Sequence, residues 1–344
     1  MFKKIKLDNG VIVRQYRSED FNFNFNMQTG YTEVWGKTED HDPEFAPFPL
    51  ICDFEITTIC SGIKGTPCKF CYKSNTPKGE YIPFEKAARV IDKLPEGITQ
   101  IAFGTDATLE SNPDWEQIFW YARNKGIIPN VTVANLDKEK AKKVAAVCGA
   151  TAVSFYGDKD ICYGTVRNLL DAGLKQVNIH QMISEETFEH TKELLRDIKT
   201  DERLKGLNAV VFLSLKQKGR GEGFHRLSQE KFSSLVEECL EQNIPFGFDS
   251  CSATKFLNHI RGTKHEHLKT FVEPCESFGV MSMYINVHGE YFPCSFSEGC
   301  PGWEKGIDIL ACDDFVKDIW NSPKLGYYRE LSLMNGRSCL FYNV

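Results

Sequence analysis

The chain has 344 residues, a formal net charge of −6 and 42% hydrophobic residues, enough for one large α/β domain with an appended module. The acidic balance argues against extended contact with a nucleic-acid backbone. No signal sequence and no run of about 18 apolar residues is present, so we expect a cytoplasmic protein without a membrane segment.

Residues 1–48 alternate in the manner of β-strands, as in FNFNFN at 21–26, and predict a short N-terminal β layer. Between residues 49 and 245, apolar runs and helical patterns alternate six times. The predicted strands are 50–58, 98–104, 128–134, 150–157, 176–183 and 207–215. The predicted helices follow them at 84–94, 113–125, 137–147, 163–173, 185–199 and 228–242.

Six strand–helix units in succession predict parallel strands joined by right-handed crossovers. The pattern alone is compatible with a partial barrel and with a doubly wound sheet, and both place the ligand site at the carboxyl ends of the strands. Residues 246–344 lose this rhythm and predict a smaller C-terminal module. It contains one hairpin, whose turn is at His288–Gly289.

The cysteine count of thirteen is the most unusual feature of the composition. An odd number without a signal sequence argues against a secreted disulfide framework, and clustered thiols then suggest metal ligands or catalytic groups. Not every cysteine is a candidate. Four lie in apolar stretches and predict small buried hydrophobes: Cys52, Cys148, Cys162 and Cys239.

Three of the cysteines, Cys60, Cys68 and Cys71, lie within the twelve residues CSGIKGTPCKFC, directly after the first predicted strand. A structural zinc site needs four ligands, usually from two CxxC pairs, and only one CxxC is present in this segment. A [4Fe–4S] cluster with three protein ligands keeps one iron open for a further ligand. Iron–sulfur binding is therefore the favoured interpretation, with zinc as the alternative.

The segment resembles the cysteine loop of the radical S-adenosylmethionine (SAM) superfamily, although seven residues separate Cys60 from Cys68, four more than in the usual CxxxCxxC spacing. The resemblance implies a partial (β/α)6 TIM-like barrel. It also implies that SAM chelates the open iron through its amino and carboxylate groups, and that reduction then gives a 5′-deoxyadenosyl radical. A flavodoxin- or ferredoxin-type protein would supply the electron.

The same resemblance suggests SAM-binding positions beside the cluster and at the carboxyl ends of the predicted strands. In the family, a Gly-Gly-Glu type motif follows the second strand, where this chain has AFGTDAT. The candidate cofactor-binding residues are Phe70, Tyr72, Gly104, Thr105, Asp106, Ser154, Asn178, His180 and Lys216. No acid–base pair or Ser-His-Asp order stands out, so the catalytic residues are unassigned.

The C-terminal region holds a second cysteine signature. Cys275 is followed by thirteen residues, Gly289, four residues and Cys294, which resembles the CX(9–15)GX4C pattern of SPASM and twitch domains. The resemblance implies one auxiliary [4Fe–4S] cluster, completed by Cys251 and Cys339. Cys300 is the competing ligand and Cys312 a weaker one.

These features predict three regions: an N-terminal β-rich extension at 1–48, a radical SAM barrel at 49–245 and an auxiliary-cluster module at 246–344. Members with such modules most often modify peptide or protein side chains, so a peptide-modifying maturase is our first expectation. Small-molecule substrates are the alternative, and a nucleotide or nucleic-acid substrate ranks third. A non-enzymatic zinc-binding interaction protein is the competing class.

Overall fold

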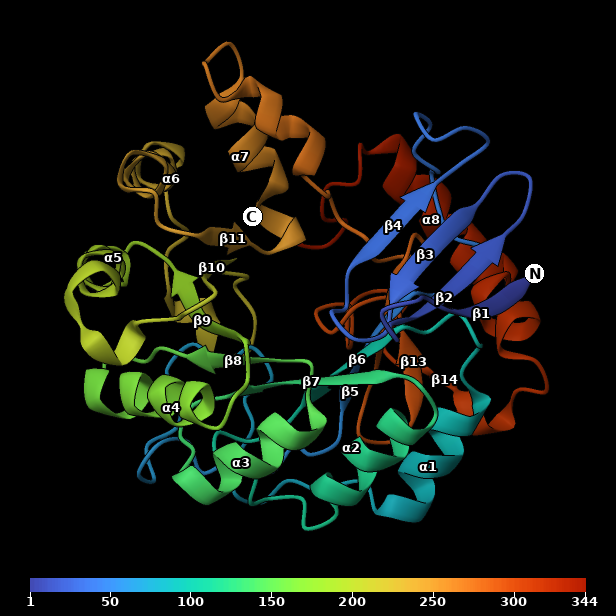
Figure 1. The fold of residues 1–344 in the computed structure, drawn as a ribbon, viewed down its shortest axis with the longest axis horizontal. Coiled ribbons are helices and arrows are strands. Elements are labelled where there is room, and N and C mark those ends of the chain that lie inside the picture. The colour runs from blue at the N-terminus through green and yellow to red at the C-terminus, as the bar shows by residue number, and fades with distance from the viewer.

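The computed structural model describes residues 1–344 and contains two sheets (Figure 1). The smaller sheet is an antiparallel meander of four strands in chain order: β1 (Phe2–Lys6), β2 (Ile12–Arg17), β3 (Asn22–Asn26) and β4 (Thr32–Trp35). The larger sheet has ten strands in the order β11-β10-β9-β8-β7-β6-β5-β12-β13-β14.

The six predicted strands form the centre of the larger sheet and pair in parallel. They are β5 (Ile51–Glu55), β6 (Gln100–Gly104), β7 (Ile128–Val133), β8 (Ala150–Ser154), β9 (Gln176–Ile183) and β10 (Ala209–Ser214). The six predicted helices are α1 (Phe84–Lys93), α2 (Trp115–Asn124), α3 (Lys138–Val147), α4 (Lys159–Asp171), α5 (Phe188–Thr200) and α6 (Gln229–Gln242).

The strand order distinguishes the two architectures that the pattern left open. A doubly wound sheet reverses direction at a switch point, whereas here β5 to β10 follow one another in chain order. The helices lie along the outside of the curved sheet (Figure 1). The fold is therefore a mixed α/β fold of the partial TIM-barrel type, as predicted.

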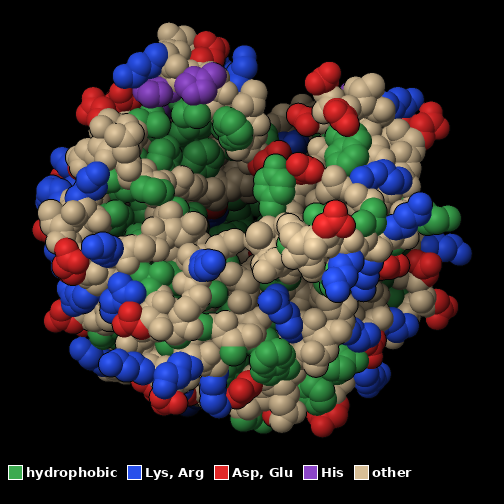
Figure 2. All heavy atoms as spheres, in the orientation of Figure 1, with side chains coloured by type: hydrophobic (Ala, Val, Ile, Leu, Met, Phe, Trp, Pro, Cys, Tyr) green, Lys and Arg blue, Asp and Glu red, His purple; other side chains and the backbone are tan.

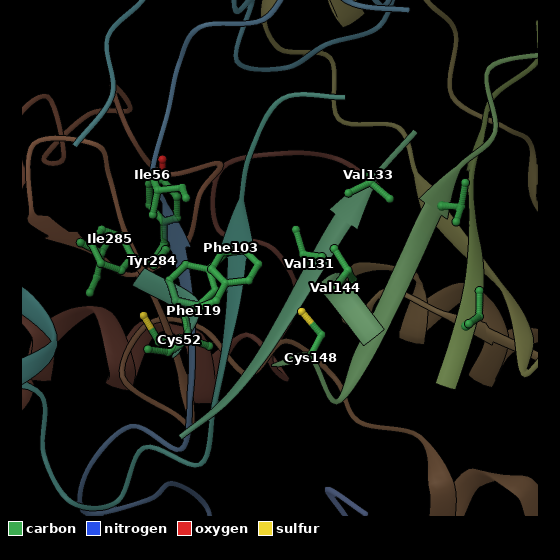
Figure 3. Packing of buried hydrophobic residues seen from close by; sticks show 14 of the residues in the cluster. Cys52, Ile56, Phe103, Phe119, Val131, Val133, Val144, Cys148, Tyr284 and Ile285 are labelled. Atoms are coloured by element: carbon green, nitrogen blue, oxygen red, sulfur yellow. The ribbon is translucent and has the colours of Figure 1, made fainter. Parts of the chain in front are cut away.

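The main hydrophobic core lies between the strands and their helices. Phe103 of β6 stacks on Phe119 of α2 with ring centroids 4.4 Å apart, and Figure 3 shows this pair beside Cys52. Alternate strand residues, such as Cys52 and Phe54, enter this core, so Asp53 and Glu55 face the barrel interior. The four cysteines predicted to be buried hydrophobes are all buried, which confirms that prediction.

The N-terminal sheet covers the amino-terminal end of the barrel. The phenylalanines of FNFNFN are buried and pack in a small cluster with Ile128, the first residue of β7. Arg14 of β2 donates to the carbonyls of Glu96, Ile98 and Gly126 at 2.8, 2.9 and 3.3 Å, in the loops that precede β6 and β7. This leaves the opposite end, where the cysteine loop emerges, for the candidate site.

The region after residue 245 contains more regular structure than its sequence indicates. A seventh parallel strand, β11 (Phe246–Phe248), and helix α7 (Ala253–Ile260) continue the series. The predicted hairpin is present as β12 (Ser282–Ile285) and β13 (Glu290–Phe292), and β12 pairs in parallel with β5, so the hairpin extends the barrel sheet. Strand β14 (Ile307–Asp308) and helix α8 (Pro323–Met334) complete this part.

Short helical turns occupy several of the connections: η1 (Glu202–Leu204), η2 (Gly219–Gly223), η3 (Ser250–Ser252), η4 (Glu266–Phe271), η5 (Ile309–Ala311) and η6 (Val316–Trp320). None of the helices has both the length and the apolar character needed to span a membrane.

Candidate functional site

The cysteine loop follows β5 at the carboxyl end of the barrel. Within the long spacer, Ile63 and Thr66 exchange backbone hydrogen bonds of 3.1 and 2.9 Å, which pinch residues 63–66 into a tight turn. Gly62 lies at the base of this turn with φ +71°, and a β-carbon there would be 1.9 Å from the Thr66 carbonyl oxygen. The extra residues thus form a side excursion between Cys60 and Cys68.

The three thiols of this loop share one neighbourhood. All three are half-buried and none forms a disulfide. Burial raises the pKa of Cys68 to about 11, and the negative charges of Cys71 and Cys60 add to the rise. As they stand, no three His, Cys, Asp or Glu side chains converge in the way that one metal ion requires. Soft sulfur donors of this kind are the ligands that zinc and iron–sulfur clusters use in proteins.

The loop after β10 fastens the cysteine loop in place. Arg220 donates from Nε to the Cys68 carbonyl at 2.8 Å, from its backbone N–H to the Cys71 carbonyl at 3.1 Å, and from Nη1 to the Asn75 carbonyl at 3.1 Å. Its neighbour Gly219 has φ +57°, and a β-carbon there would be 2.4 Å from the Tyr72 carbonyl oxygen. Only glycine permits this approach. Arg220 was noted in the sequence with Lys216 and Lys218 as part of a basic loop after the sixth strand, but no cofactor-binding role was predicted for it, because such a loop is often solvated.

The aromatic residues of the cysteine loop pack on two different neighbours. The Phe70 ring lies 5.5 Å from Tyr156 and 5.8 Å from Phe224. Tyr72 packs on Phe296 at 4.3 Å, beside the C-terminal cysteines. Tyr156 also was not predicted, although it follows β8 by two residues. Desolvation raises the pKa of Tyr156, and the charges of Cys68, Cys71 and Cys60 contribute to the rise.

The predicted residues after β6 differ in their surroundings. Gly104 lies against β5, where a β-carbon would be 3.2 Å from the Glu55 Cα. The Thr105 hydroxyl donates to the Thr132 carbonyl at 3.4 Å. The Asp106 carboxylate is buried and closes its own loop, because it accepts from the Thr108 and Ser111 backbone N–H groups at 3.0 and 3.2 Å and from both of their hydroxyls. Asp106 therefore stabilises the conformation of the loop that follows β6.

The predicted residues on β8 and β9 line the barrel interior. Ser154 and His180 are paired across the two strands, and burial lowers the pKa of His180 to about 4, so this ring is neutral at pH 7. Asn178 lies two residues nearer the amino end of β9, where its Oδ1 accepts from Asn208 at 2.8 Å. Asn178 is thus placed apart from the cysteine loop.

Lys216, at the end of β10, is buried in an ion pair with Asp249. Its ammonium group lies 4.9 Å from the centre of the Phe296 ring. Burial alone would lower the pKa of Lys216, but the negative charges of Asp249 and Cys251 outweigh it, and the pKa is raised. Lys216 thus lies toward the C-terminal cysteines.

The four predicted auxiliary ligands, which lie in four separate segments, influence one another's pKa. Burial raises the pKa of Cys294 to about 12, and the charges of Cys275 and Cys339 add to it. Burial also raises the pKa of Cys251, where Cys275 and Cys339 contribute again. These charge effects indicate neighbouring thiols, although no three of the side chains converge in the way that one metal ion requires.

The two competing cysteines lie in different places. Cys300 is adjacent to the group, because Tyr342 contacts both Cys300 and Cys339. The Tyr342 hydroxyl lies 3.4 Å from the Cys300 Sγ, and the Tyr342 backbone N–H donates to the Cys339 Sγ at 3.4 Å. Cys312 is part of the main hydrophobic core, and its thiol donates to the Ile309 carbonyl at 3.0 Å. Cys312 is therefore a core residue.

A buried charged network joins the two cysteine groups. Lys73 lies 3.1 Å from Glu55 Oε2, pairs with Glu298, and donates to the Tyr284 hydroxyl at 2.8 Å. Tyr284 in turn donates to Glu55 at 2.9 Å. Lys218 donates to the carbonyls of Phe296 and Glu298 at 3.1 and 2.6 Å. The cysteine loop, the β10 loop and the segment around Cys294 are thus held as one unit.

No protein-family model and no curated protein matches the chain. Solved structures do resemble it. Methylornithine synthase (PylB) is 13% identical, with a TM-score of 0.46 over 85% of this chain and 83% of that chain. BtrN in complex with AdoMet and 2-DOIA is 12% identical, with a TM-score of 0.38 over 82% and 86%.

Coproporphyrinogen III oxidase (HemN) from Escherichia coli, a radical SAM enzyme, is 10% identical, with a TM-score of 0.39 over 73% of this chain and 62% of that chain. An HpcH/HpaI aldolase is also among the similar structures. At these scores the likenesses carry no argument about the reaction. The functional assignment rests on the residues of this chain.

Proposed function

We propose that the protein is a radical SAM enzyme in which Cys60, Cys68 and Cys71 hold a [4Fe–4S] cluster with one open iron. The observation that carries the proposal is the gathering of three half-buried, unpaired thiols on a fastened loop at the carboxyl end of a parallel barrel. A zinc-binding interaction protein is the competing class, and it would need a fourth ligand. When bound, the cluster and SAM supply a 5′-deoxyadenosyl radical that takes a hydrogen atom from the substrate.

In this proposal the surrounding residues bind and orient SAM. Tyr156 and Phe70 form an aromatic wall beside the three thiols, and Ser154 and the neutral His180 offer hydrogen-bonding groups below it. Gly104 lets the end of β6 lie close to the Glu55 backbone of β5, beside the start of the cysteine loop. Arg220 and Gly219 keep the loop in one arrangement, and the N-terminal sheet excludes water from the far end of the barrel.

We infer that Cys251, Cys275, Cys294 and Cys339 hold one auxiliary [4Fe–4S] cluster. Burial raises the pKa of Cys251, Cys275 and Cys294, and the charge of Cys339 contributes to each rise, which supports this ligand set. With all four positions filled by protein, such a cluster would serve electron transfer or structure. The charged network from Lys73 to Glu298 gives the two cluster loops a fixed separation.

The substrate that we propose is a peptide or protein side chain, with a small molecule as the alternative. The test is anaerobic reconstitution with iron and sulfide, followed by reduction in the presence of SAM. We expect a broad absorption band near the edge of the visible range and release of 5′-deoxyadenosine. Stoichiometric zinc without SAM cleavage would instead identify the non-enzymatic class.

A further inference from the structure

The larger sheet ends at β11, which has β10 as its single neighbour and pairs with it in parallel. The β10 backbone bonds to the Pro245 carbonyl at 3.1 Å and to the Asp249 N–H at 3.0 Å. In a parallel pair, residues whose backbone groups face the neighbouring strand alternate with residues whose groups face away from it. The N–H and C=O groups of Phe246 and Phe248 therefore face away from β10, and no other part of the chain bonds to them.

A hollow of about 540 Å³ lies along this free edge, and all three residues of β11 line it. Aromatic and aliphatic side chains from α6, from α7 and from the segment around η4 form its other walls: Leu240, Phe256, Leu268, Phe271 and Val272. In Figure 2, hydrophobic side chains gather on the α6–α7 side of the opening between that lobe and the lobe of the N-terminal sheet. The unpaired backbone groups thus border open space that apolar side chains enclose.

The other sheet edges carry features that block the addition of a strand. β14, at the opposite edge of the larger sheet, has only two residues, and its Asp308 carboxylate caps the turn that follows. In the N-terminal sheet, the edge strand β4 presents the exposed Glu33, and the edge strand β1 presents exposed lysines at positions 3, 4 and 6. Short edge strands and exposed charges prevent pairing with other chains. β11 has the sequence Phe-Gly-Phe and no charge, so its edge is unprotected.

The side-chain directions along β11 define what an added strand would present. The Phe248 ring lies 4.7 Å from Phe256 of α7, on the helix side of the sheet. Gly247 points to the opposite face, where a β-carbon would be 3.9 Å from Val211, the β10 residue that pairs with His180 in the barrel interior. Paired residues on neighbouring strands share a face of the sheet. An added strand therefore places alternate side chains in the apolar hollow and the others in the barrel interior.

We propose that an extended segment of the peptide substrate adds to β11 as a further strand, through main-chain hydrogen bonds to Phe246 and Phe248. The hollow takes the apolar side chains at alternate positions of that segment, and the residue between them enters the barrel interior. A lipid or another apolar molecule would leave the strand-spaced donors and acceptors unused, whereas a peptide backbone satisfies them. The inference rests on the proposed function and deepens it, because it states how a peptide substrate is recognised.

The test measures binding to the reconstituted protein by fluorescence anisotropy. The probe is the fluorescein-labelled peptide Thr-Leu-Thr-Leu-Thr-Leu-Thr-amide, whose alternation fixes which face meets the hollow. Two further probes carry N-methyl groups, one on the three leucines and the other on the three threonines that follow a leucine. We expect one methylated peptide to bind about tenfold or more weakly than the other, because only one alternate set of N–H groups faces β11. Equal affinities of the two methylated peptides, or no binding of the unmodified one, would overturn the proposal.

Two pairs of variants locate the site. Phe248→Pro removes one outward N–H and keeps the groups that bond to β10, whereas the control Phe248→Leu keeps that N–H. Phe271→Asp places a charge at the rim of the hollow, where Phe271 is 80% exposed, and its control is Met334→Asp, at a position on α8 that is 85% exposed. We expect Phe248→Pro and Phe271→Asp each to weaken binding of the unmodified peptide about fivefold or more, and the controls to bind it within about twofold of the full chain. Unchanged binding in both test variants contradicts the assignment. A thermal melt checks the fold of each variant, and the Phe271 pair decides if Phe248→Pro does not fold.

The β11 edge of a second copy is the competing occupant, and sedimentation of the protein tests for it. A dimer that Phe271→Asp dissociates, without any binding of the peptide, would assign the edge to the second copy and overturn the proposal. The outcome is also separable from that of the proposed function, because release of 5′-deoxyadenosine without peptide tests the radical chemistry alone. If the protein cleaves SAM but does not bind the peptide, the strand-addition site fails and the proposed function stands. If one methylated peptide binds selectively but SAM is not cleaved, the site stands and the proposed function fails.

Discussion

The backbones of Gly62 and Pro67 approach each other closely at the base of the turn in the cysteine loop, where a β-carbon on Gly62 would be 2.7 Å from the Pro67 Cα. The intervening turn, Ile63–Thr66, is closed by its own backbone hydrogen bonds and is largely exposed. Removal of these four residues would join Gly62 to Pro67 and give the sequence CSGPCKFC, with the shorter CxxxCxxC spacing.

We predict that this deletion variant binds as much iron after reconstitution as the full chain and cleaves SAM at a similar rate. The control is Gly62→Ala, which forces a side chain into the Thr66 carbonyl and a left-handed conformation that costs roughly 1–2 kcal/mol. It should lower the iron content. Loss of iron in the deletion variant would mean that the turn itself shapes the site.

The second prediction concerns the hydrogen bonds by which Arg220 holds the cysteine loop. Arg220→Met removes the bonds from the guanidinium to the Cys68 and Asn75 carbonyls, and we expect a chelator to extract iron about tenfold faster, because hydrogen bonds from a charged donor contribute roughly 1.5–3 kcal/mol. Arg226→Met, at an exposed position in the same loop, is the control. Equal extraction rates for the two variants would show that the clamp is dispensable.

The auxiliary ligand set gives the third prediction. Cys294→Ala should reduce the iron content from about eight atoms per chain to about four, since one of two [4Fe–4S] clusters is lost. Cys312→Ala should keep all of the iron, because that thiol bonds to the Ile309 carbonyl inside the core. Iron loss in both variants would point to general unfolding, and a thermal melt of each variant tests for that.

The fourth prediction concerns pH. Desolvation between the barrel strands raises the pKa of Asp53 to about 6, so the folded protein binds a proton there between pH 4 and 6 that the unfolded chain does not. This carboxylate therefore destabilises the fold progressively as the pH rises from 4 to 6. We expect Asp53→Asn to raise the melting temperature at pH 8 and to leave it unchanged at pH 4. A shift that is equal at both pH values would contradict the assigned cause.

The barrel could be predicted because apolar strands and amphipathic helices each carry a local period. All six predicted strands and all six helices are present, with boundaries displaced by a few residues. Strand β11 was missed because a segment of three residues that includes Gly247 carries no usable period. The parallel pairing of β12 with β5 joins residues more than two hundred positions apart, and local patterns contain no information about it.

The cysteines could be predicted as groups because their spacing is itself a signal. The residues that position them could not. Arg220 and Tyr156 act through tertiary contacts, and Asp106 matched a motif in type although its carboxylate closes its own loop.

The central claim is that the cluster at Cys60, Cys68 and Cys71 has an open iron that binds SAM. The most direct measurement is the electron paramagnetic resonance spectrum of the reduced, reconstituted Cys294→Ala variant, which removes the auxiliary signal, recorded before and after SAM is added. The account predicts a [4Fe–4S] signal whose line positions shift on addition of SAM. A cluster signal that SAM leaves unchanged, or the absence of any cluster signal, would contradict it.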